Sequence, residues 1–310
     1  MNYLITGGAG FIGSHLAEKL LSLGHKVIII DDLSTGSINN ISTFKKHPNL
    51  ELHIDTILNE KLLAELIEKS DFIFHLAAAV GVRYIIENAL KSLIINTKGT
   101  ELVLEYANKL GNKPLLITST SEVYGKNENV PFVETADSVF GPTSITRWGY
   151  ACSKALDEFL AHAYYRERKL PVIIVRLFNT CGPRQTGQYG MVIPRFVMQA
   201  LKNEPLTIYG DGEQTRSFCS VFDVVEAFIN LMSTPACFGE IFNVGNNKPI
   251  TIKQLAELVI KLTNSKSKIK YISFEDAFES GFEDMKHRAP NIDKIAKFIG
   301  YSPKIDIEEL

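Results

Sequence analysis

The chain of 310 residues has few cysteines, and they suggest no metal site. They lie far apart in the sequence and form no C-x-x-C pair, at Cys152, Cys181, Cys219 and Cys237. This spacing is typical of neither a zinc site nor a disulfide framework. We therefore expect free, buried thiols, no bound metal, and a location in the reducing cytoplasm.

A strong net charge and a long apolar run are also lacking. The formal net charge is −2, which gives no electrostatic signature of binding to nucleic acid or to an anionic membrane. No apolar run approaches the ~20 residues needed to span a bilayer. With 45% hydrophobic and 22% charged residues, the composition is that of an ordinary globular protein. We predict neither a nucleic-acid partner nor a membrane partner.

The first 178 residues contain short apolar runs that alternate with stretches of helical periodicity. Runs rich in Ile, Val and Leu predict strands at 3–6, 26–31, 50–54, 71–77, 114–119 and 171–177. Helical periodicity predicts helices at 12–23, 60–69, 85–110 and 149–168. This order predicts an α/β fold of the Rossmann type, a doubly wound parallel sheet covered by helices on both faces.

The pattern changes after residue 178. Residues 179–190, "NTCGPRQTGQYG", are rich in Gly, Gln and Thr and predict a loop. Further helices are predicted with short strands between them, at 192–202, 222–233, 251–263 and 291–299. We predict a Rossmann domain over 1–178 and a smaller substrate-binding lobe, mainly over 179–310. The segment near 219–244 is expected to return to the first domain.

A glycine-rich turn follows the first predicted strand. Gly7, Gly10 and Gly13 allow a tight turn, a close approach of the backbone to a pyrophosphate, and close packing of the next helix. That helix presents free N–H groups to phosphates at its N-terminus. The second strand ends at Asp31, where a carboxylate would bind an adenosine ribose, and Asp31 and Asp32 would repel a 2′-phosphate. The pattern favours NAD over NADP, in an enzyme or in a Rossmann protein without chemistry.

A second group of residues indicates chemistry. The apolar run at 114–119 leads into Thr120, Ser121 and Glu122, although an unpaired buried carboxylate is costly. Tyr150 and Lys154 are four residues apart on a predicted helix and share one face. A nearby ammonium lowers the pKa of a phenol, which otherwise lies near ~10. Tyr150 would then exchange a proton with a hydroxyl while hydride moves to nicotinamide.

The whole chain resembles the extended short-chain dehydrogenase/reductases that modify nucleotide sugars. The matching motifs are "TGGAGFIG", "HLAA", Asn96 with "KGT", "STSEVYG", "YACSK", "RLFNTCGPR", "IYGDGEQTRSF" and "HRAPNI". The resemblance implies a tightly bound NAD that is recycled in each turnover, and a UDP-sugar substrate. It also implies a homodimer, in which the helices at 88–110 and 149–168 form a four-helix bundle between subunits.

The resemblance assigns roles to individual residues. Tyr150 would be the base, Lys154 would lower its pKa and hold the ribose, and Thr120 would bind the C4 hydroxyl, with Ser121 and Glu122 completing the catalytic group. Further NAD contacts are expected from Phe11, Ile12, Asp55, Leu76, Ala77, Ala78 and Asn96. Substrate contacts are expected from Tyr84, Asn179, Arg184, Tyr209, Arg216 and Arg288.

The motif around Glu122 bears on the reaction that follows oxidation of C4. "TSEVYG", Tyr84, "RW.Y" and "HRAPNI" resemble UDP-glucuronate decarboxylases, in which Glu122 would orient the sugar or assist protonation of C5 after carbon dioxide leaves. A 4-epimerase acting on UDP-glucose or UDP-glucuronate is the alternative, and a UDP-sugar dehydratase and an NAD-sensing protein rank lower. Our matching places Met191 where decarboxylases commonly carry an arginine for the sugar carboxylate. Arg184 or Arg195 would then substitute, or the substrate would be neutral.

Overall fold

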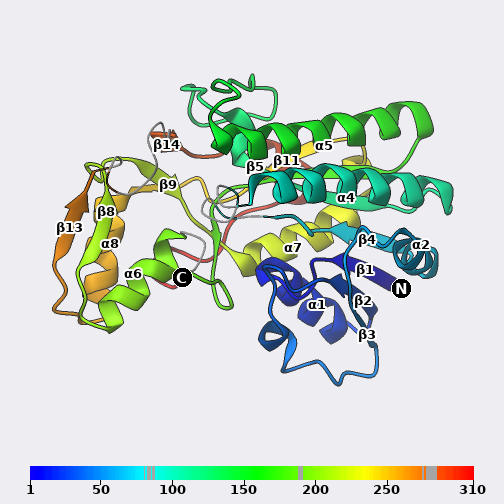
Figure 1. The fold of residues 1–310 in the computed structure, drawn as a ribbon, viewed down its shortest axis with the longest axis horizontal. Coiled ribbons are helices and arrows are strands. Elements are labelled where there is room, and N and C mark those ends of the chain that lie inside the picture. Colours follow the sequence, from blue (N-terminus) through cyan, green and yellow to red (C-terminus); the bar gives the residue numbers. More distant parts are fainter. Residues whose placement is uncertain (80, 82–84, 86–87, 188–190, 274–275, 277–284) are drawn as a thin grey trace.

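The computed structural model describes residues 1–79, 81, 85, 88–187, 191–273, 276 and 285–310. Its centre is a sheet of seven parallel strands in the order β11-β6-β5-β4-β1-β2-β3 (Figure 1). These strands are β1 (Asn2–Thr6), β2 (Lys26–Asp31), β3 (Leu50–Ile54), β4 (Phe72–His75), β5 (Leu115–Thr120), β6 (Val172–Leu177) and β11 (Ile241–Val244). The predicted doubly wound parallel sheet is confirmed.

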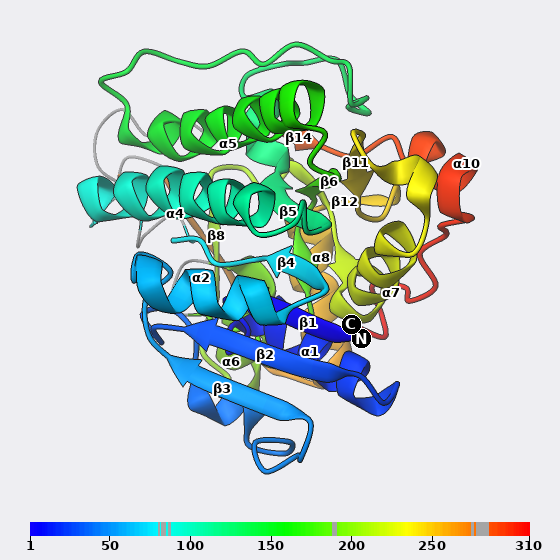
Figure 2. The same cartoon turned by 90° about the vertical axis from the view of Figure 1, so that its right-hand side faces the viewer.

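Alternation of side chains along the strands explains why helices cover both faces. Ile5 of β1 packs into one core cluster, whereas its neighbour Leu4 packs into the other. The first cluster is covered by α1 (Phe11–Ser22), α7 (Val221–Met232) and α10 (Asp293–Ile299). The second is covered by α2 (Glu60–Lys69), α4 (Ala89–Lys109) and α5 (Thr146–Arg168) (Figure 2). Each fully buried Leu or Ile stabilises the fold by about 1.5–3 kcal/mol.

The strand order places a crevice between β1 and β4. From β1 the chain proceeds to β2 and β3 on one side, and then crosses to β4, β5 and β6 on the other. In doubly wound sheets, ligands bind in a crevice outside the carboxyl ends of the strands at such a switch point. The residues that follow β1, β4 and β5 therefore meet at one edge of the sheet.

A smaller lobe lies beyond the carboxyl edge of the sheet, at the left of Figure 1. Its core joins α6 (Val192–Leu201) and α8 (Ile252–Leu262) to the parallel pair β8 (Leu206–Tyr209) and β13 (Ile269–Ile272). Three short strands form a second sheet that links this lobe to the site, β9 (Thr215–Ser217), β12 (Pro249–Thr251) and β14 (His287–Arg288). The remaining short elements are β7 (Thr180–Cys181), β10 (Cys219–Ser220), η1 (Ile38–Ile41), η2 (Ser121–Tyr124) and η3 (Pro235–Cys237).

The chain returns from the small lobe to the large sheet. Helix α7 packs against α1, and β11 pairs in parallel with β6 at the edge of the sheet. The boundary at residue 178 between two domains stays a prediction. In the described part of the chain, no helix combines the length and apolar character needed to cross a membrane.

Candidate active site

The turn between β1 and α1 has room only for glycine at two positions. Gly7 has a φ of +73°, and a Cβ there would lie 2.8 Å from the backbone nitrogen of Ala77. A Cβ on Gly13 would lie 2.2 Å from the carbonyl oxygen of Gly7. The turn is therefore tight, and α1 begins directly after Gly10 with the N–H groups of its first turn, including those of Phe11 and Ile12, directed out of the helix. This shape fits the pyrophosphate of a dinucleotide.

Asp31 lies at the end of β2 beside this turn. Its Oδ2 accepts a hydrogen bond from Ala9 N at 2.9 Å, and its Oδ1 accepts one from Leu33 N at 2.8 Å. Burial raises the pKa of the Asp31 carboxyl, and the two backbone bonds oppose that rise. Its neighbour Asp32 is more exposed and accepts a bond from Ser34 N at 2.9 Å. The predicted ribose contact from Asp31 stays a prediction, and the described bonds fix its carboxylate against the glycine turn.

The segment after β4 closes the opposite wall of the crevice. Leu76 N donates to Thr6 O at 3.1 Å, and Ala77 N donates to Thr6 Oγ1 at 3.2 Å. Asn96 holds the same segment, because its Oδ1 accepts a hydrogen bond from Ala79 N at 2.8 Å. The structure thus brings "HLAA" and Asn96 together. Asp55, which follows β3, caps the next segment by accepting bonds from Thr56 N and Asn59 Nδ2.

Tyr150 lies in the first turns of α5, within reach of the residues that follow β5. It shares a hydrogen bond with the hydroxyl of Thr120, which lowers its pKa, as does the charge of Arg288. Burial is the largest influence and raises the pKa of Tyr150, with further rises from the carboxylates of Glu122 and Asp157. The net shift is upward. This differs from our expectation that a neighbouring ammonium would lower the pKa, because burial disfavours the charged phenolate and the two carboxylates add to that rise.

Lys154 is engaged by Asp157, one turn further along α5. Its Nζ donates to Asp157 Oδ2 at 2.7 Å, and both side chains are buried. Asp157 also shares a hydrogen bond with the hydroxyl of Thr100. That hydroxyl lies 3.1 Å from His75 Nε2, at the end of β4. Burial lowers the pKa of His75 to about 3, so this imidazole at the end of β4 is neutral.

Glu122 is paired with two arginines. Its Oε1 lies 3.5 Å from Nη1 of Arg288 and 3.6 Å from Nη2 of Arg147, and all three side chains are largely buried. Arg288 comes from β14, and its Nη1 also lies 3.4 Å from Ser121 Oγ. Thr120 Oγ1 accepts a hydrogen bond from Glu122 N at 3.2 Å and so fixes the start of η2. The charge that the sequence places at the end of β5 is therefore compensated.

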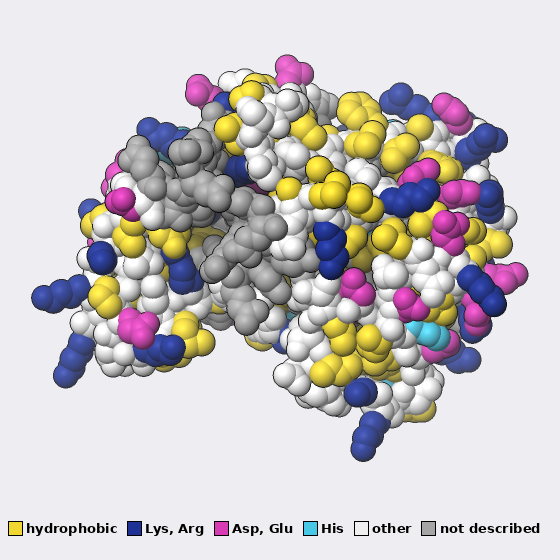
Figure 3. All heavy atoms as spheres, in the orientation of Figure 1, with side chains coloured by type: hydrophobic (Ala, Val, Ile, Leu, Met, Phe, Trp, Pro, Cys, Tyr) yellow, Lys and Arg dark blue, Asp and Glu magenta, His cyan; other side chains and the backbone are white. Residues whose placement is uncertain are grey.

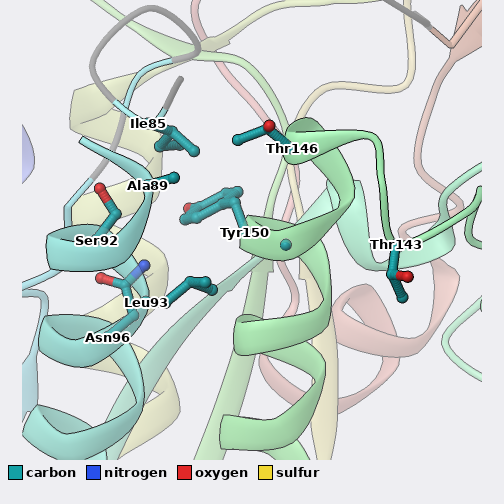
Figure 4. A pocket seen from close by; sticks show the side chains of 9 residues that line it. Ile85, Ala89, Ser92, Leu93, Asn96, Thr143, Thr146 and Tyr150 are labelled. Atoms are coloured by element: carbon teal, nitrogen blue, oxygen red, sulfur yellow. The ribbon is translucent and has the colours of Figure 1, made fainter. Parts of the chain in front are cut away.

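A cavity of about 220 Å³ lies beside Tyr150, between the N-terminal ends of α4 and α5 (Figure 4). The Tyr150 ring points from α5 toward α4, where Ser92 and Leu93 lie about one turn before Asn96. Ser92 Oγ is buried there, and it has no hydrogen-bond partner among the residues that the structure describes. Thr143 and Thr146 line the other side. The cavity gives the reacting end of Tyr150 a partly polar neighbourhood.

A buried ion pair supports this end of the sheet. Arg176 of β6 donates from Nε to Glu158 Oε1 at 2.9 Å and from Nη2 to Glu158 Oε2 at 2.7 Å. Ser119 of β5 donates to the same carboxylate at 2.5 Å. The contacts join α5, β5 and β6, so they fix Tyr150 and Glu122 relative to each other. Trp148 packs against Phe140 beneath the same turn of α5.

Three of the predicted substrate residues lie at the side of the small lobe. Asn179 has a φ of +36° after β6, and its Nδ2 donates to Ser217 O at 3.0 Å. Arg216 is buried in β9 and donates from Nη1 to Thr215 O at 2.8 Å. Tyr209 ends β8, with the guanidinium of Arg195 4.2 Å above its ring. Their contacts with a sugar nucleotide stay predictions.

The substrate contact predicted for Arg184 also stays a prediction. Arg184 lies against α1, where its Nη2 contacts Glu18 Oε2 at 2.5 Å and its Nη1 donates to Ser14 Oγ at 3.3 Å. Met191 stands at the N-cap of α6. The described contacts of Arg184 and Arg195 do not join either residue to Glu122. Tyr84 lies outside the residues that the structure describes.

Comparisons with known proteins agree with this geometry. The family described as GDP-mannose 4,6 dehydratase matches residues 4–310. The chain belongs to this family. A relative from Bacillus cytotoxicus, a UDP-N-acetyl-alpha-D-glucosaminuronate decarboxylase, is 42% identical over 99% of this chain and 94% of its own length. UDP-glucuronic acid decarboxylase 1 of Xenopus tropicalis is 36% identical over 99% of this chain and 69% of its own length.

Solved structures of epimerases are also similar. UDP-glucose 4-epimerase from Thermotoga maritima with UDP-glucose has a TM-score of 0.89 and 30% identity, and the match covers 100% of this chain and 96% of that one. UDP-glucuronic acid 4-epimerase from Bacillus cereus, in complex with UDP-glucuronic acid and NAD, has a TM-score of 0.88 and 28% identity, with the same coverage. The predicted resemblance to nucleotide-sugar enzymes is confirmed, and the chain is an enzyme.

Sequence reasoning missed Arg147 and Asp157. Both lie on α5, three residues before and seven residues after Tyr150. Residues at these spacings share one face of a helix with Tyr150 and Lys154. This shared face was therefore visible in the sequence. Asp157 pairs with Lys154 within α5 itself, whereas Arg147 contacts Glu122 only because η2 lies beside α5.

Proposed function

We propose that this protein is an NAD-dependent decarboxylase of a UDP-hexuronate. The observation that carries the proposal is the contact of Glu122 with Arg147 and Arg288 at the end of β5, beside Tyr150. Guanidinium groups bind carboxylates well, and a buried site for an acidic sugar needs them. Decarboxylases commonly carry an arginine for the sugar carboxylate at the position of Met191. In this protein, Arg147 and Arg288 would supply that positive charge instead.

The first step oxidises C4 of the sugar. NAD, when bound, supplies the oxidant for C4 and is regenerated before the product leaves. The turn from Gly7 to Gly13, Asp31 and the segment held by Asn96 would hold it. Tyr150 takes the proton of the C4 hydroxyl, and Thr120 keeps the phenol in place through their shared hydrogen bond. Lys154 would face the nicotinamide ribose from the next turn of α5.

The second step removes the carboxylate. A ketone at C4 makes the C6 carboxylate β to a carbonyl, so the C5–C6 bond breaks, carbon dioxide leaves, and the electron pair forms an enolate over C5 and C4. C5 then takes a proton, and reduction of C4 returns the proton held by Tyr150. One proton from solvent is consumed overall. Glu122, in contact with Arg288 and Arg147, delivers this proton or orients the ring to receive it.

A 4-epimerase of a UDP-hexuronate is the second candidate. The same arginines suit an acidic sugar that keeps its carboxylate, and the Bacillus cereus epimerase was solved with UDP-glucuronic acid. The two reactions share the oxidation of C4 and differ in whether C5–C6 breaks. The similarity to a decarboxylase extends over the whole chain at higher identity, which supports our first choice.

The decisive experiment incubates the purified protein with UDP-glucuronate and, separately, with UDP-N-acetylglucosaminuronate, without added NAD. Mass spectrometry and proton NMR of the products distinguish the candidates. Loss of carbon dioxide to give a UDP-pentose supports the decarboxylase, and the better substrate shows whether C2 carries a hydroxyl or an acetamido group. A product of unchanged mass with inverted configuration at C4 would instead support the epimerase. Tyr150→Phe is the matched control, because it removes only the phenolic oxygen and should abolish either reaction.

A homodimer is also part of the proposal. Helices α4 and α5 lie side by side and expose large apolar side chains, among which Leu90 and Phe159 are 74% and 73% exposed. Figure 3 shows hydrophobic side chains over this part of the surface. Covering them with the same helices of a second subunit gives a four-helix bundle. Phe159→Glu should yield a monomer in sedimentation analysis, whereas Leu201→Glu on α6, at a side chain that is 65% exposed, should not. A wild-type monomer at micromolar concentration would contradict the dimer.

The location of the enzyme also belongs to the proposal. All four cysteines are free, and three of them are buried. We expect the chain to work in the reducing cytoplasm, where such thiols persist. Fractionation of cells that produce the protein, followed by detection with an antibody, would test this expectation.

A further inference from the structure

Asp157 is a buried carboxylate whose role the reaction above does not specify. Its side chain is 0% exposed and that of Lys154 is 3% exposed, and their contact measures 2.7 Å from Nζ to Oδ2. Burying a carboxylate costs several kcal/mol unless a charge and hydrogen bonds compensate it. An apolar residue at this position would pack without that cost. The carboxylate is therefore best explained by what it does to its neighbours.

Lys154 is the cation that contacts Asp157, and the other neighbours of the carboxylate differ in charge. On the side of β4 and α4, the hydroxyl of Thr100 shares a hydrogen bond with Asp157 and lies 3.1 Å from His75 Nε2. His75 is neutral, and its Nδ1 lies 2.7 Å from Thr6 Oγ1. On this side the pair meets uncharged hydroxyls and an imidazole, while Glu158, the next residue on α5, places a second carboxylate near Asp157 and raises the pKa of its carboxyl. One N–H bond of the ammonium is fixed by Asp157, and this restricts where Nζ can stand.

We propose that Asp157 is a positioning residue that anchors the Lys154 ammonium beside Tyr150 and sets the pH range in which Tyr150 acts as a base. The link to catalysis rests on the proposed function, whereas the anchoring of Lys154 does not. Asp157 need not touch the substrate for this role. It acts through Lys154, and through its own charge on the nearby phenol.

The direction of the effect follows from the charges that face Tyr150. From η2, Glu122 raises the pKa of Tyr150, and from β14 Arg288 lowers it. Asp157, on α5 itself, raises that pKa as well. Arg147 and Lys154 are the cations of the same helix face, and His75 of β4 is neutral. Removing the charge of Asp157 should therefore lower the pKa of Tyr150 and favour the phenolate.

The first test needs no substrate. The full chain is labelled with ¹³C at Cζ of tyrosine, and the Tyr150 signal is assigned by its loss in Tyr150→Phe. In Asp157→Asn, the Tyr150 signal should titrate at a pH lower by about one unit, the lower end of the range for a neighbouring charge. Asp157→Glu restores the charge and should titrate close to wild type. An unmoved signal in Asp157→Asn would overturn the proposal.

A matched control separates charge from packing. Asp223 is a buried carboxylate on α7 that accepts hydrogen bonds from Lys304 N and Ile305 N. Asp223→Asn loses a comparable buried charge in another part of the fold and should leave the Tyr150 signal where it is. A shift of equal size in this variant would overturn the proposal, because a general loss of stability would then explain both results.

The second test uses turnover. With whichever UDP-sugar the enzyme converts, kcat should rise with pH on the acid limb of its pH profile. In Asp157→Asn this limb should lie at lower pH, by the same shift as in the NMR titration. A purely structural role would lower kcat and leave the limb unmoved, which would overturn the proposal. If the wild-type enzyme converted no UDP-sugar, the proposed function would fail, while the NMR titration would still decide the role of Asp157.

Discussion

The carboxylate oxygen Oε1 of Glu122 lies 3.5 Å from the guanidinium nitrogen Nη1 of Arg288. The two residues are 166 positions apart in the sequence and come together only because β14 returns to the end of β5. Arg147 approaches the same oxygen from α5. A carboxylate between two guanidiniums is held in one orientation, which suits a group that must face one carbon of the substrate.

Replacing Glu122 with Gln tests its part in the second step. The side chain keeps its size and loses its charge and its exchangeable proton. We expect formation of the UDP-pentose to fall by about 10²–10⁴-fold, the usual contribution of a positioned acid or base. Oxidation of C4 should continue, so absorbance at 340 nm should rise in a single turnover. The exposed Glu226→Gln on α7 is the control. Equal loss of both steps would show that Glu122 acts in the first.

Asp31 is expected to select the cofactor. Asp31→Ser removes a carboxylate that accepts bonds from Ala9 N and Leu33 N and that would repel a 2′-phosphate. Loss of a hydrogen bond to a charged group costs about 1.5–3 kcal/mol, so NAD affinity should fall about ten- to hundredfold. The affinity for NADP should fall less or rise. Fluorescence titration measures both constants. Asp32→Asn should change the preference for NAD over NADP less than Asp31→Ser does. A larger effect of Asp32→Asn would mean that Asp32, and not Asp31, selects the cofactor.

The hydroxyl of Thr120 should tune the pH dependence. Its hydrogen bond with Tyr150 lowers the pKa of the phenol, against the upward shift caused by burial. Since the phenolate is the base, activity on the acid side rises with pH through the pKa of Tyr150. Thr120→Val removes the bond and should move that limb to higher pH. Thr118→Val, which loses a bond to His75 O instead, is the control. A limb that stays in place in Thr120→Val would show that the bond does not act on the reacting phenol.

The ion pair of Arg176 and Glu158 is expected to govern stability. Glu158→Gln leaves a buried guanidinium without its charge partner, which costs about 3–5 kcal/mol. Urea denaturation should show this loss in the free energy of unfolding. Glu105→Gln removes a partner of an exposed pair on α4 and should change the midpoint little. Equal stability of the two variants would mean that solvent reaches the Arg176 pair.

The fold was predictable from local signals, and the charge pairing was not. Runs of Ile, Val and Leu determine the strands, and a glycine turn with an acidic residue at the end of the next strand determines the crevice. The partners of charged side chains depend on elements that are distant in sequence. Arg184 shows this, because its Glu18 partner lies on α1. Arg147 shows it as well, since its helical spacing from Tyr150 was visible while its contact with Glu122 was not.

The central claim is that C4 is oxidised and reduced again within one turnover while C6 is lost as carbon dioxide. Incubating the enzyme with UDP-glucuronate that carries deuterium at C4, without added NAD, tests both parts in one measurement. We expect a UDP-pentose by mass spectrometry, with the deuterium still at C4 by NMR. A product of unchanged mass with inverted C4, or a pentose that has lost the deuterium, would contradict it.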